Sequence, residues 1–341
     1  MGTTRRRTVG RALAGVLGMA AWAGMGAQPA LAEVTELRIT KQPGIIYLPN
    51  IVMEQQKLVE QAADKLGLKG LSVKFITFGG GGAATDALLS GNVDIVTTGA
   101  SNMLLLWDRT RGQVKGLAGA SATPMWLVSR DPAVKTLEDL KPSDRIAVPT
   151  VKVSSQAIIL QIAARKLFGD AKADHFDGMT VTLGHPDAAA ALMNGSGSIT
   201  GHFSGAPYQA AEANAAGMHV VTTSDKILGG PYSNAVYFTT TKFHDGNPQV
   251  IKAFMEAAQQ ASDFIGAHPR EACELYLKAT GEKYTVDELL AQIGDPKTSY
   301  STAPFGMQMV ADHMALTKVL RTRPASWKEF FFPEAAGLPG N

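Results

Sequence analysis

The sequence predicts an α/β fold built in two lobes, and three observations lead to this prediction. Segments of strand and helix character alternate along the chain, an order typical of parallel sheets covered by helices. A strand-to-helix unit at residues 89–103 has a related counterpart about a hundred residues later, at residues 193–204. A chain of 341 residues is also long enough to form two lobes, each with its own core.

Residues 89–103 carry the clearest local signals. A helix is predicted to end at Leu89, Gly91 supplies the left-handed residue after it, and residues 93–97 have the composition of a buried strand. Small polar residues at 98–101 then open the next helix. We expect their N–H groups and hydroxyls to face outward at the carboxyl edge of a parallel sheet, where open α/β sheets bind ligands.

The first lobe begins before this unit and continues after it. Its predicted strands are residues 37–41, 73–78, 93–97 and 114–120. A loop at residues 42–47 follows the first strand, and apolar residues between Ile51 and Leu66 recur at helical spacing, which predicts one helix there. The glycine run at residues 79–82 predicts a turn before a helix at residues 83–89.

The second lobe repeats the alternation. Pro124 interrupts the chain before residues 125–130, which predict the first crossing between the lobes. The predicted strands of this lobe are residues 145–148, 179–183, 199–203 and 218–222. Its predicted helices are residues 154–168, 187–194 and 207–216. Residues 234–240 have the alternating pattern and the β-branched residues of a strand, so they predict the strand that returns to lobe one.

The remaining sequence is mostly helical from Pro248 onward. Pro248 and Pro269 stand where the first turn of a helix tolerates proline, and we expect this tail to pack on lobe one. The predicted domains are therefore lobe one at residues 33–125 and 235–341, and lobe two at residues 126–234. Two crossing strands between the lobes predict a hinge.

Residues 1–32 have the pattern of a cleavable secretion signal. Four arginines precede an apolar stretch, and Ala30-Leu31-Ala32 forms a small-residue cleavage site. The apolar stretch is short for a membrane anchor. The pair Arg5-Arg6 leaves both the Sec and the twin-arginine export routes open. The only cysteine is Cys273, so a lipoprotein anchor is not expected, and the sequence predicts a periplasmic protein.

Several function classes lack support in the sequence. Loss of the four signal arginines changes the formal charge from +2 to −2, and no basic run with interleaved aromatics remains to bind nucleic acid. No Gly-x-Ser-x-Gly motif occurs, and the seven histidines do not recur at metal-ligand spacing. Cys273 lies between acidic residues that disfavour a thiolate. We expect no catalysis, no metal and no cofactor.

Loops from both predicted lobes can meet in a cleft. Residues 150–156 place hydroxyls at a helix start, where unpaired N–H groups bind anions, although Ser154 can also simply cap its own helix. The run at residues 79–82 lacks the ending of a phosphate-binding loop and instead predicts a turn that brings backbone close to a ligand. His202 can be a core residue or a ligand contact, and the same alternatives hold for Tyr47 and Tyr232.

The ordered motifs resemble the nitrate, sulfonate and taurine group of periplasmic solute-binding proteins of ABC importers. The resemblance extends over essentially the whole mature chain. It is carried by Gln42-Pro43-Gly44, residues 89–95, Leu137-Glu138-Asp139-Leu140 with residues 145–148, and Ala206-Pro207. It implies a type II periplasmic binding protein fold: two α/β lobes with parallel-type sheets, joined by two hinge crossings, with the ligand between them.

The resemblance also implies partners and site residues. Such a protein, as a monomer, delivers a small ligand to a membrane permease with its ATPase subunits, and backbone amides and hydroxyls hold the anionic head of that ligand. The residues expected to contact ligand are Gln42, Tyr47, Gly80, Ser101, Asn102, Thr150, Ser154, Ser155, His202, Ser204 and Tyr232. Tyr47, Phe203 and Tyr232 can stack on an aromatic ring.

The ligand itself stays open at this point. The candidate loops contain one cation, Lys152, which favours a monoanion or a zwitterion such as a sulfonate, taurine, nitrate or an aromatic acid. One alternative is a neutral pyrimidine precursor of thiamine, which related proteins of this fold bind. Another is a ligand sensor that docks to a receptor kinase instead of a permease.

Overall fold

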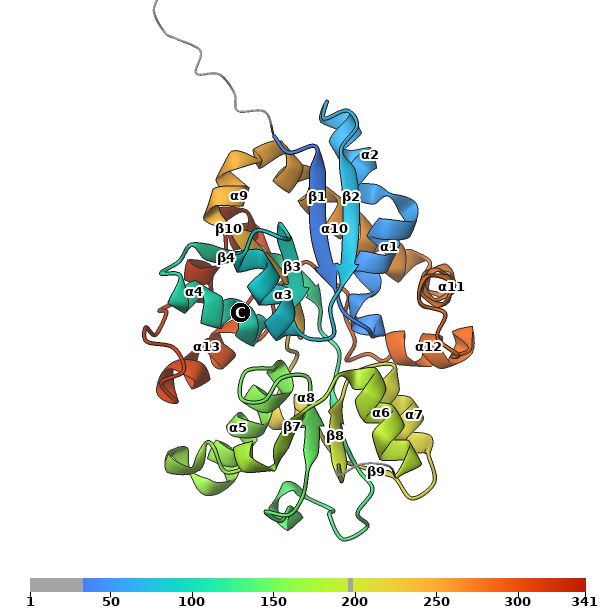
Figure 1. The fold of residues 1–341 in the computed structure, drawn as a ribbon, viewed down its shortest axis with the longest axis vertical. Helices are drawn as coiled ribbons and strands as arrows, with labels where there is room; N and C mark the ends of the chain where they lie inside the picture. Colours follow the sequence, from blue (N-terminus) through green and yellow to red (C-terminus); the bar gives the residue numbers. More distant parts are fainter. Residues whose placement is uncertain (1–32, 196–198) are drawn as a thin grey trace, which may run out of the picture. The chain divides into compact units, whose positions relative to one another are not determined.

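Two five-stranded sheets organise residues 33–341 (Figure 1). The computed structural model describes residues 33–195 and 199–341, so the predicted secretion signal lies outside the described residues. The first sheet has the order β2-β1-β3-β10-β4, and the second has the order β7-β6-β8-β5-β9. The strands are β1 Glu36–Lys41, β2 Ser72–Thr77, β3 Ile95–Thr98, β4 Val114–Ser121, β5 Trp126–Ser129, β6 Ile146–Val148, β7 Thr180–Thr182, β8 Gly201–Ser204, β9 His219–Thr223 and β10 Ala235–Thr240.

The two sheets share one topology. In the first, β10 is antiparallel to both of its neighbours, β3 and β4, while β1 is parallel to β2 and β3. In the second, β5 is likewise antiparallel to β8 and β9, while β6 is parallel to β7 and β8. The predicted parallel arrangement therefore holds for four strands of each sheet and not for the fifth.

The antiparallel direction of β5 and β10 has one physical reason. β5 and β10 are the strands that the chain enters on arriving from the other sheet, after β4 and after the helix that follows β9. The other strands run toward the junction of the sheets, so a strand that starts at the junction must run away from it. Each crossing thus produces one antiparallel strand, and the two crossings form the predicted pair of hinge connections.

The helices cover the faces of both sheets (Figure 1). They are α1 Leu48–Gln56, α2 Leu58–Lys65, α3 Gly81–Leu89, α4 Ala100–Arg109, α5 Ser155–Phe168, α6 His185–Asn194, α7 Tyr208–Asn214, α8 Ser224–Leu228, α9 Thr241–Gly246, α10 Pro248–Ala267, α11 Pro269–Thr280, α12 Val286–Ile293 and α13 Met307–Leu316. Pro248 and Pro269 open α10 and α11, and Gly91 has a φ of 74° after α3, as predicted.

The prediction of one helix between Ile51 and Leu66 is wrong. Lys57 adopts a left-handed conformation with a φ of 53° and separates α1 from α2. The break lets the two helices pack separately: α1 contacts α10 and α11, and α2 contacts α10. The sequence did not reveal this break, because apolar residues keep their helical spacing on both sides of Lys57.

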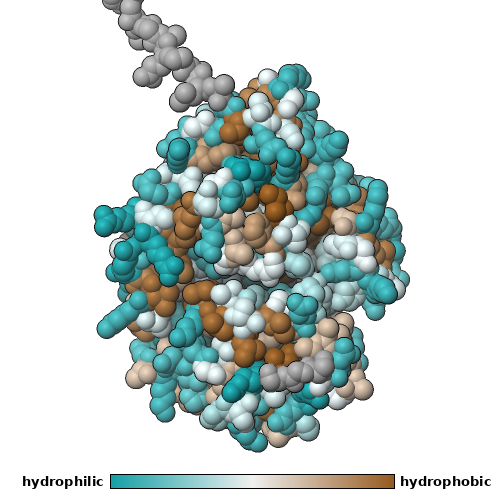
Figure 2. All heavy atoms as spheres, viewed as in Figure 1, coloured by the Kyte–Doolittle hydropathy of each residue, from teal (hydrophilic) through white to brown (hydrophobic). Residues whose placement is uncertain are grey.

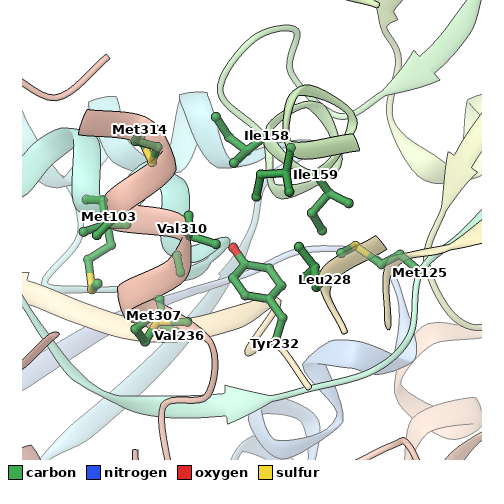
Figure 3. Close-up of a cluster of buried hydrophobic side chains, with 14 of the residues drawn as sticks. Met103, Met125, Ile158, Ile159, Leu228, Tyr232, Val236, Met307, Val310 and Met314 are labelled. Atoms are coloured by element: carbon green, nitrogen blue, oxygen red, sulfur yellow. The ribbon is translucent and has the colours of Figure 1, made fainter. Parts of the chain in front are cut away.

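A buried apolar cluster joins the two sheets on one side of the junction (Figure 3). Tyr232, which is 5% exposed, lies between Met307 and Val310 of α13 and Ile159 of α5. Leu228 packs beside the same ring. The tail therefore does more than cover lobe one, because α13 also contacts α5 of the second lobe.

Among the helices of the described ranges, none is both long and apolar enough to cross a bilayer. In Figure 2 the apolar residues on the viewed face are interspersed with hydrophilic ones.

A glycine in β4 tests the packing of the tail on the first sheet. The N–H of Gly119 donates to the carbonyl of Thr302 at 2.8 Å, and a Cβ at Gly119 would stand 2.4 Å from the carbonyl oxygen of Ala303. We expect Gly119→Ala to lower the free energy of unfolding by about 1–3 kcal/mol, because backbone has to move. Urea denaturation measures this. The control is Gly178→Ala, where a Cβ meets nothing within 4 Å, and equal stabilities for the two variants would contradict the packing.

Candidate ligand site

Loops from both sheets enclose a polar cavity of about 30 Å³ at the junction. The lining residues from the first sheet's side are Gln42, Ile46, Tyr47, Gly81, Thr98, Gly99 and Asn102. Those from the second sheet's side are Pro149, Thr150, Ser154, Ser155, Gln156 and His185, and the crossings add Met125 and Asn234. The lining contains no Asp, Glu, Lys or Arg side chain. Polar recognition there depends on amides, hydroxyls, an imidazole and the backbone.

Four helices begin at this cavity. The lining includes Gly81 and His185, the first residues of α3 and α6, and Ser155, the first residue of α5. It also includes Gly99, the residue before α4. Each helix start carries unpaired N–H groups and the positive end of a macrodipole, equivalent to roughly half an elementary charge. The cavity is therefore electropositive without a charged side chain, an arrangement that binds anions.

Hydrogen bonds fix several lining side chains. The Gln42 amide donates to the hydroxyl of Thr98 at 2.8 Å. Ser154 accepts from the N–H of Ala157 at 3.3 Å and so caps α5, while the same residue lines the cavity. Both alternatives considered for Ser154 are thus compatible in one structure. Burial raises the pKa of the Tyr47 hydroxyl, which therefore stays protonated as a hydrogen-bond donor at neutral pH.

Direct bonds across the junction and to the return crossing surround the cavity. The Ser101 hydroxyl of one lobe donates to the carbonyl of Val153 of the other at 2.7 Å. The Ser155 hydroxyl lies 2.9 Å from the phenol oxygen of Tyr232 on the return crossing. On another side, Tyr208 of α7 donates to a carboxylate oxygen of Glu282 at 2.5 Å. These contacts hold the lobes together around a space far below the 300 Å³ or more of a typical ligand pocket.

A chain of buried polar side chains starts at the second lobe's wall of the cavity. The amide nitrogen of Gln156 lies 3.2 Å from Nε2 of His185, whose Nδ1 lies 2.8 Å from Nε2 of His202. Nδ1 of His202 is 2.7 Å from Oε1 of Glu212, which also accepts from Ser204 at 3.0 Å. Burial lowers the pKa of His202 to about 3 and raises the pKa of Glu212 to about 8.

The structure places about half of the expected contact residues on the cavity wall. Gln42, Tyr47, Asn102, Thr150, Ser154 and Ser155 line it. Gly80 precedes α3, next to the lining Gly81. Tyr232 does not line the cavity, but its phenol hydrogen-bonds the lining Ser155. Ser101 is directed to Val153 instead, and His202 and Ser204 lie behind the wall, bonded to Glu212.

Two other residues of the candidate loops do not line the cavity. The side chain of Phe203 is fully buried in the apolar core, so it is not available to stack on a ligand. The Lys152 side chain is exposed and is not part of the lining. The only cation of the candidate loops therefore does not contribute a charge inside the cavity.

His185 and Gln156 line the cavity although the sequence did not single them out as ligand contacts. His185 opens α6 directly after the loop that follows β7, so its place in a strand-to-helix loop was the available signal. Glu212 gave no signal, because a lone acid in a short helix looks like a solvated surface residue. It is in fact completely buried.

Several larger cavities lie elsewhere, with volumes of about 550, 610, 620 and 340 Å³. The first lies between α7 and α12, and the second lies beside the crossings near Gly229 and Pro296. We favour the small cavity as the ligand site because helix starts from both lobes point to it.

Among the described residues no cluster of three His, Cys, Asp or Glu side chains could hold a metal ion. Burial raises the pKa of the Cys273 thiol to about 11, which keeps it unreactive.

The two matching sheets, the double crossing and the junction cavity define the periplasmic binding protein fold. This chain belongs to the NMT1/THI5-like family, whose model matches residues 57–272. No curated protein shows a significant sequence match.

Solved structures of solute-binding proteins share the fold. The alkanesulfonate-binding protein SsuA from Xanthomonas axonopodis pv. citri, bound to MOPS, matches with a TM-score of 0.69 at 17% identity, over 87% of this chain and 98% of that one. The aliphatic sulphonate binding protein SsuA from Escherichia coli matches with a TM-score of 0.64 at 18% identity, over 87% and 97%. A zinc-bound ligand-binding component of an ABC-type import system from Staphylococcus aureus matches with a TM-score of 0.66 at 16% identity, over 89% and 98%.

A close approach across the junction gives a test of closure. A Cβ on Gly99 would stand 2.5 Å from the hydroxyl oxygen of Ser155, on the opposite lobe. We expect Gly99→Ala to hold the lobes apart, which would increase the radius of gyration measured by small-angle X-ray scattering. Adding Ser155→Gly removes the clashing hydroxyl and should restore the compact value. An unchanged radius in Gly99→Ala would contradict a tight junction at this point.

Proposed function

We propose that this protein is the periplasmic solute-binding subunit of an ABC importer and that its ligand is a small organic monoanion. The observation that carries the proposal is the convergence of four helix starts on a cavity without charged side chains. Partial positive charges from helix ends suit one negative charge. A doubly charged ligand would lack a neutralising cation. The protein would hand its ligand to a permease with its ATPase subunits and act as a monomer without catalysis.

A sulfonate is the ligand class that we favour. Three tetrahedral sulfonate oxygens can accept hydrogen bonds from several helix starts at once. The solved SsuA proteins of similar fold bind alkanesulfonates, and one is bound to MOPS. Taurine, nitrate and aromatic acids carry the same single negative charge and belong in the same experiment.

Ligand capture is proposed to proceed by hinge closure. Residues 33–125 and 235–341 form lobe one and residues 126–234 form lobe two, and the crossings between them form the hinge. Because a cavity of about 30 Å³ cannot hold an organic sulfonate, the lobes have to separate for a ligand to enter. Ligand contacts to both walls exist only when the lobes close on the ligand, in a form wider than this one by the volume of the ligand, so they shift the equilibrium toward that form.

One observation favours a second candidate, a neutral nitrogen heterocycle such as a thiamine pyrimidine. Four side-chain amides line the cavity, those of Gln42, Asn102, Gln156 and Asn234. Amides offer paired donors and acceptors, which match the edge of an aminopyrimidine better than they match a sulfonate. A sensor that docks to a receptor kinase would bind ligand by the same contacts and differ only in its partner.

A thermal-shift screen tests the proposed ligand class. We expect ethanesulfonate, taurine, MOPS, nitrate or benzoate to raise the melting temperature of ligand-stripped protein, since ligand at a thousand times its Kd stabilises by about 4 kcal/mol. A shift with an aminopyrimidine alone would replace the anion by the neutral candidate. No shift with any compound would contradict the binding function.

The two serines at the start of α5 provide the matched variants. We expect Ser154→Ala combined with Ser155→Ala to weaken binding of the anion by about tenfold or more, because hydrogen bonds to a charged group are each worth about 1.5–3 kcal/mol. Calorimetric titration measures this. Ser90→Ala, on the exposed end of α3, is the control. If the double variant binds the anion as tightly as the wild type, the start of α5 does not hold it.

A further inference from the structure

A row of hydrogen-bonded side chains, which we call the relay, runs from Gln156 through His185 and His202 to Glu212. It connects a fully buried carboxyl group to the candidate cavity. Its members come from four elements of one lobe: Gln156 from α5, His185 from α6, His202 from β8 and Glu212 from α7. Both nitrogens of each imidazole are engaged within the chain. Each neutral imidazole has one donor and one acceptor nitrogen, so the direction of all the hydrogen bonds in the chain is set from one end.

We propose that Glu212 is a positioning residue whose protonation state decides whether the second lobe's wall of the cavity donates or accepts hydrogen bonds. The inference rests on the proposed anion-binding function and adds a determinant of specificity to it. Glu212 does not touch the cavity, so it would act only through His202 and His185.

When Glu212 is protonated, its hydroxyl donates to Nδ1 of His202. The Nε2–H group of His202 then donates to Nδ1 of His185. The Nε2–H group of His185 donates to the amide oxygen of Gln156, which requires that amide to turn over, because in the structure its nitrogen faces His185. The amide –NH₂ of Gln156 is thereby free to donate to a ligand. This direction provides a donor for a sulfonate oxygen.

When Glu212 is ionised, every bond reverses. His202 donates from Nδ1 to the carboxylate, His185 donates from Nδ1 to His202, and Gln156 donates its –NH₂ to Nε2 of His185. The amide oxygen of Gln156 then faces the ligand. An oxygen lone pair beside a sulfonate is repulsive, so this direction disfavours an anion.

The surroundings of Glu212 support the protonated form at neutral pH. Burial raises its pKa to about 8, and the opposing effect of the Ser204 hydroxyl is smaller. The other oxygen, Oε2, has no hydrogen-bond partner, so the proton is best placed on Oε1, facing His202. With the pKa of His202 lowered to about 3, neither member of the pair carries a charge at pH 7.

Other ionisable groups near α7 are engaged elsewhere or lack a bond to Glu212. Tyr208 of α7 donates to Glu282, and His219 of β9 bonds to the carbonyl of Val134. Burial raises the pKa of the Tyr284 phenol, before α12, and the nearby charges of Glu282 and Glu212 raise it further, so Tyr284 faces Glu212 without a bond to it. Two further groups, Asp187 at the exposed start of α6 and Glu288 in the capping box of α12, have no hydrogen bond to the relay. β5 has no ionisable side chain.

Imidazole ¹⁵N NMR of the ligand-free protein tests the relay without any ligand. Between pH 6.5 and pH 9.5 we expect His185 and His202 to exchange the Nε2–H for the Nδ1–H tautomer, with a midpoint near the Glu212 pKa of about 8. Glu212→Gln retains a donor at the same place and should hold both histidines in the Nε2–H form across this range. One unchanging tautomer in the wild type, or continued exchange in Glu212→Gln, would overturn the proposal.

Binding of ethanesulfonate provides the second measurement. We expect its affinity to fall by about tenfold or more between pH 7 and pH 9.5 in the wild type, and to stay level in Glu212→Gln. Glu288→Gln removes a neighbouring carboxylate that bonds only the start of its own helix, outside the relay, and should keep the wild-type profile. A level profile in the wild type would refute the relay and leave the binding function intact. Absence of ethanesulfonate binding at every pH would instead count against the proposed function, while the NMR result would still decide the relay.

Discussion

The structure depends on a directional constraint: most strands of both sheets run toward the junction between the lobes. In a strand-to-helix unit, the helix begins where the strand ends, so this direction brings the starts of α3, α4, α5 and α6 to one place. The resulting positive potential comes from backbone rather than from ionised side chains. A site of this kind needs no arginine or lysine, and its electrostatic strength is fixed by the fold itself.

The contacts around this site differ from one side of the junction to the other. On one side Tyr232 lies in an apolar cluster that joins α13 to α5, with its phenol oxygen next to Ser155 (Figure 3). On the other side the closing contact is polar, from Tyr208 to Glu282. Apolar side chains do not titrate, whereas a carboxylate does. The lobes thus meet at two surfaces of different chemistry, with the candidate cavity between them.

Much of the fold follows from local sequence patterns. All ten strands were predicted within a few residues, and the order of strands and helices indicated the two sheets and their crossings. The break at Lys57 was missed because helical spacing of apolar residues continues through it, and only the packing of α1 and α2 on α10 reveals two helices. The antiparallel direction of β5 and β10 was also missed, since strand direction depends on where the chain enters a sheet.

For the candidate site, the sequence by itself determined which loops lie at the junction, because a loop that follows a parallel strand must emerge at its carboxyl end. That is sufficient to place Gln42, Asn102, Thr150 and Ser154 on the cavity wall. Only the tertiary structure decided which side chains of those loops face inward. Ser101 turns to Val153 because the start of α4 packs against the loop before α5 of the other lobe. His202 lies behind His185 because α6 packs on β8 and on α7, which carries the buried Glu212.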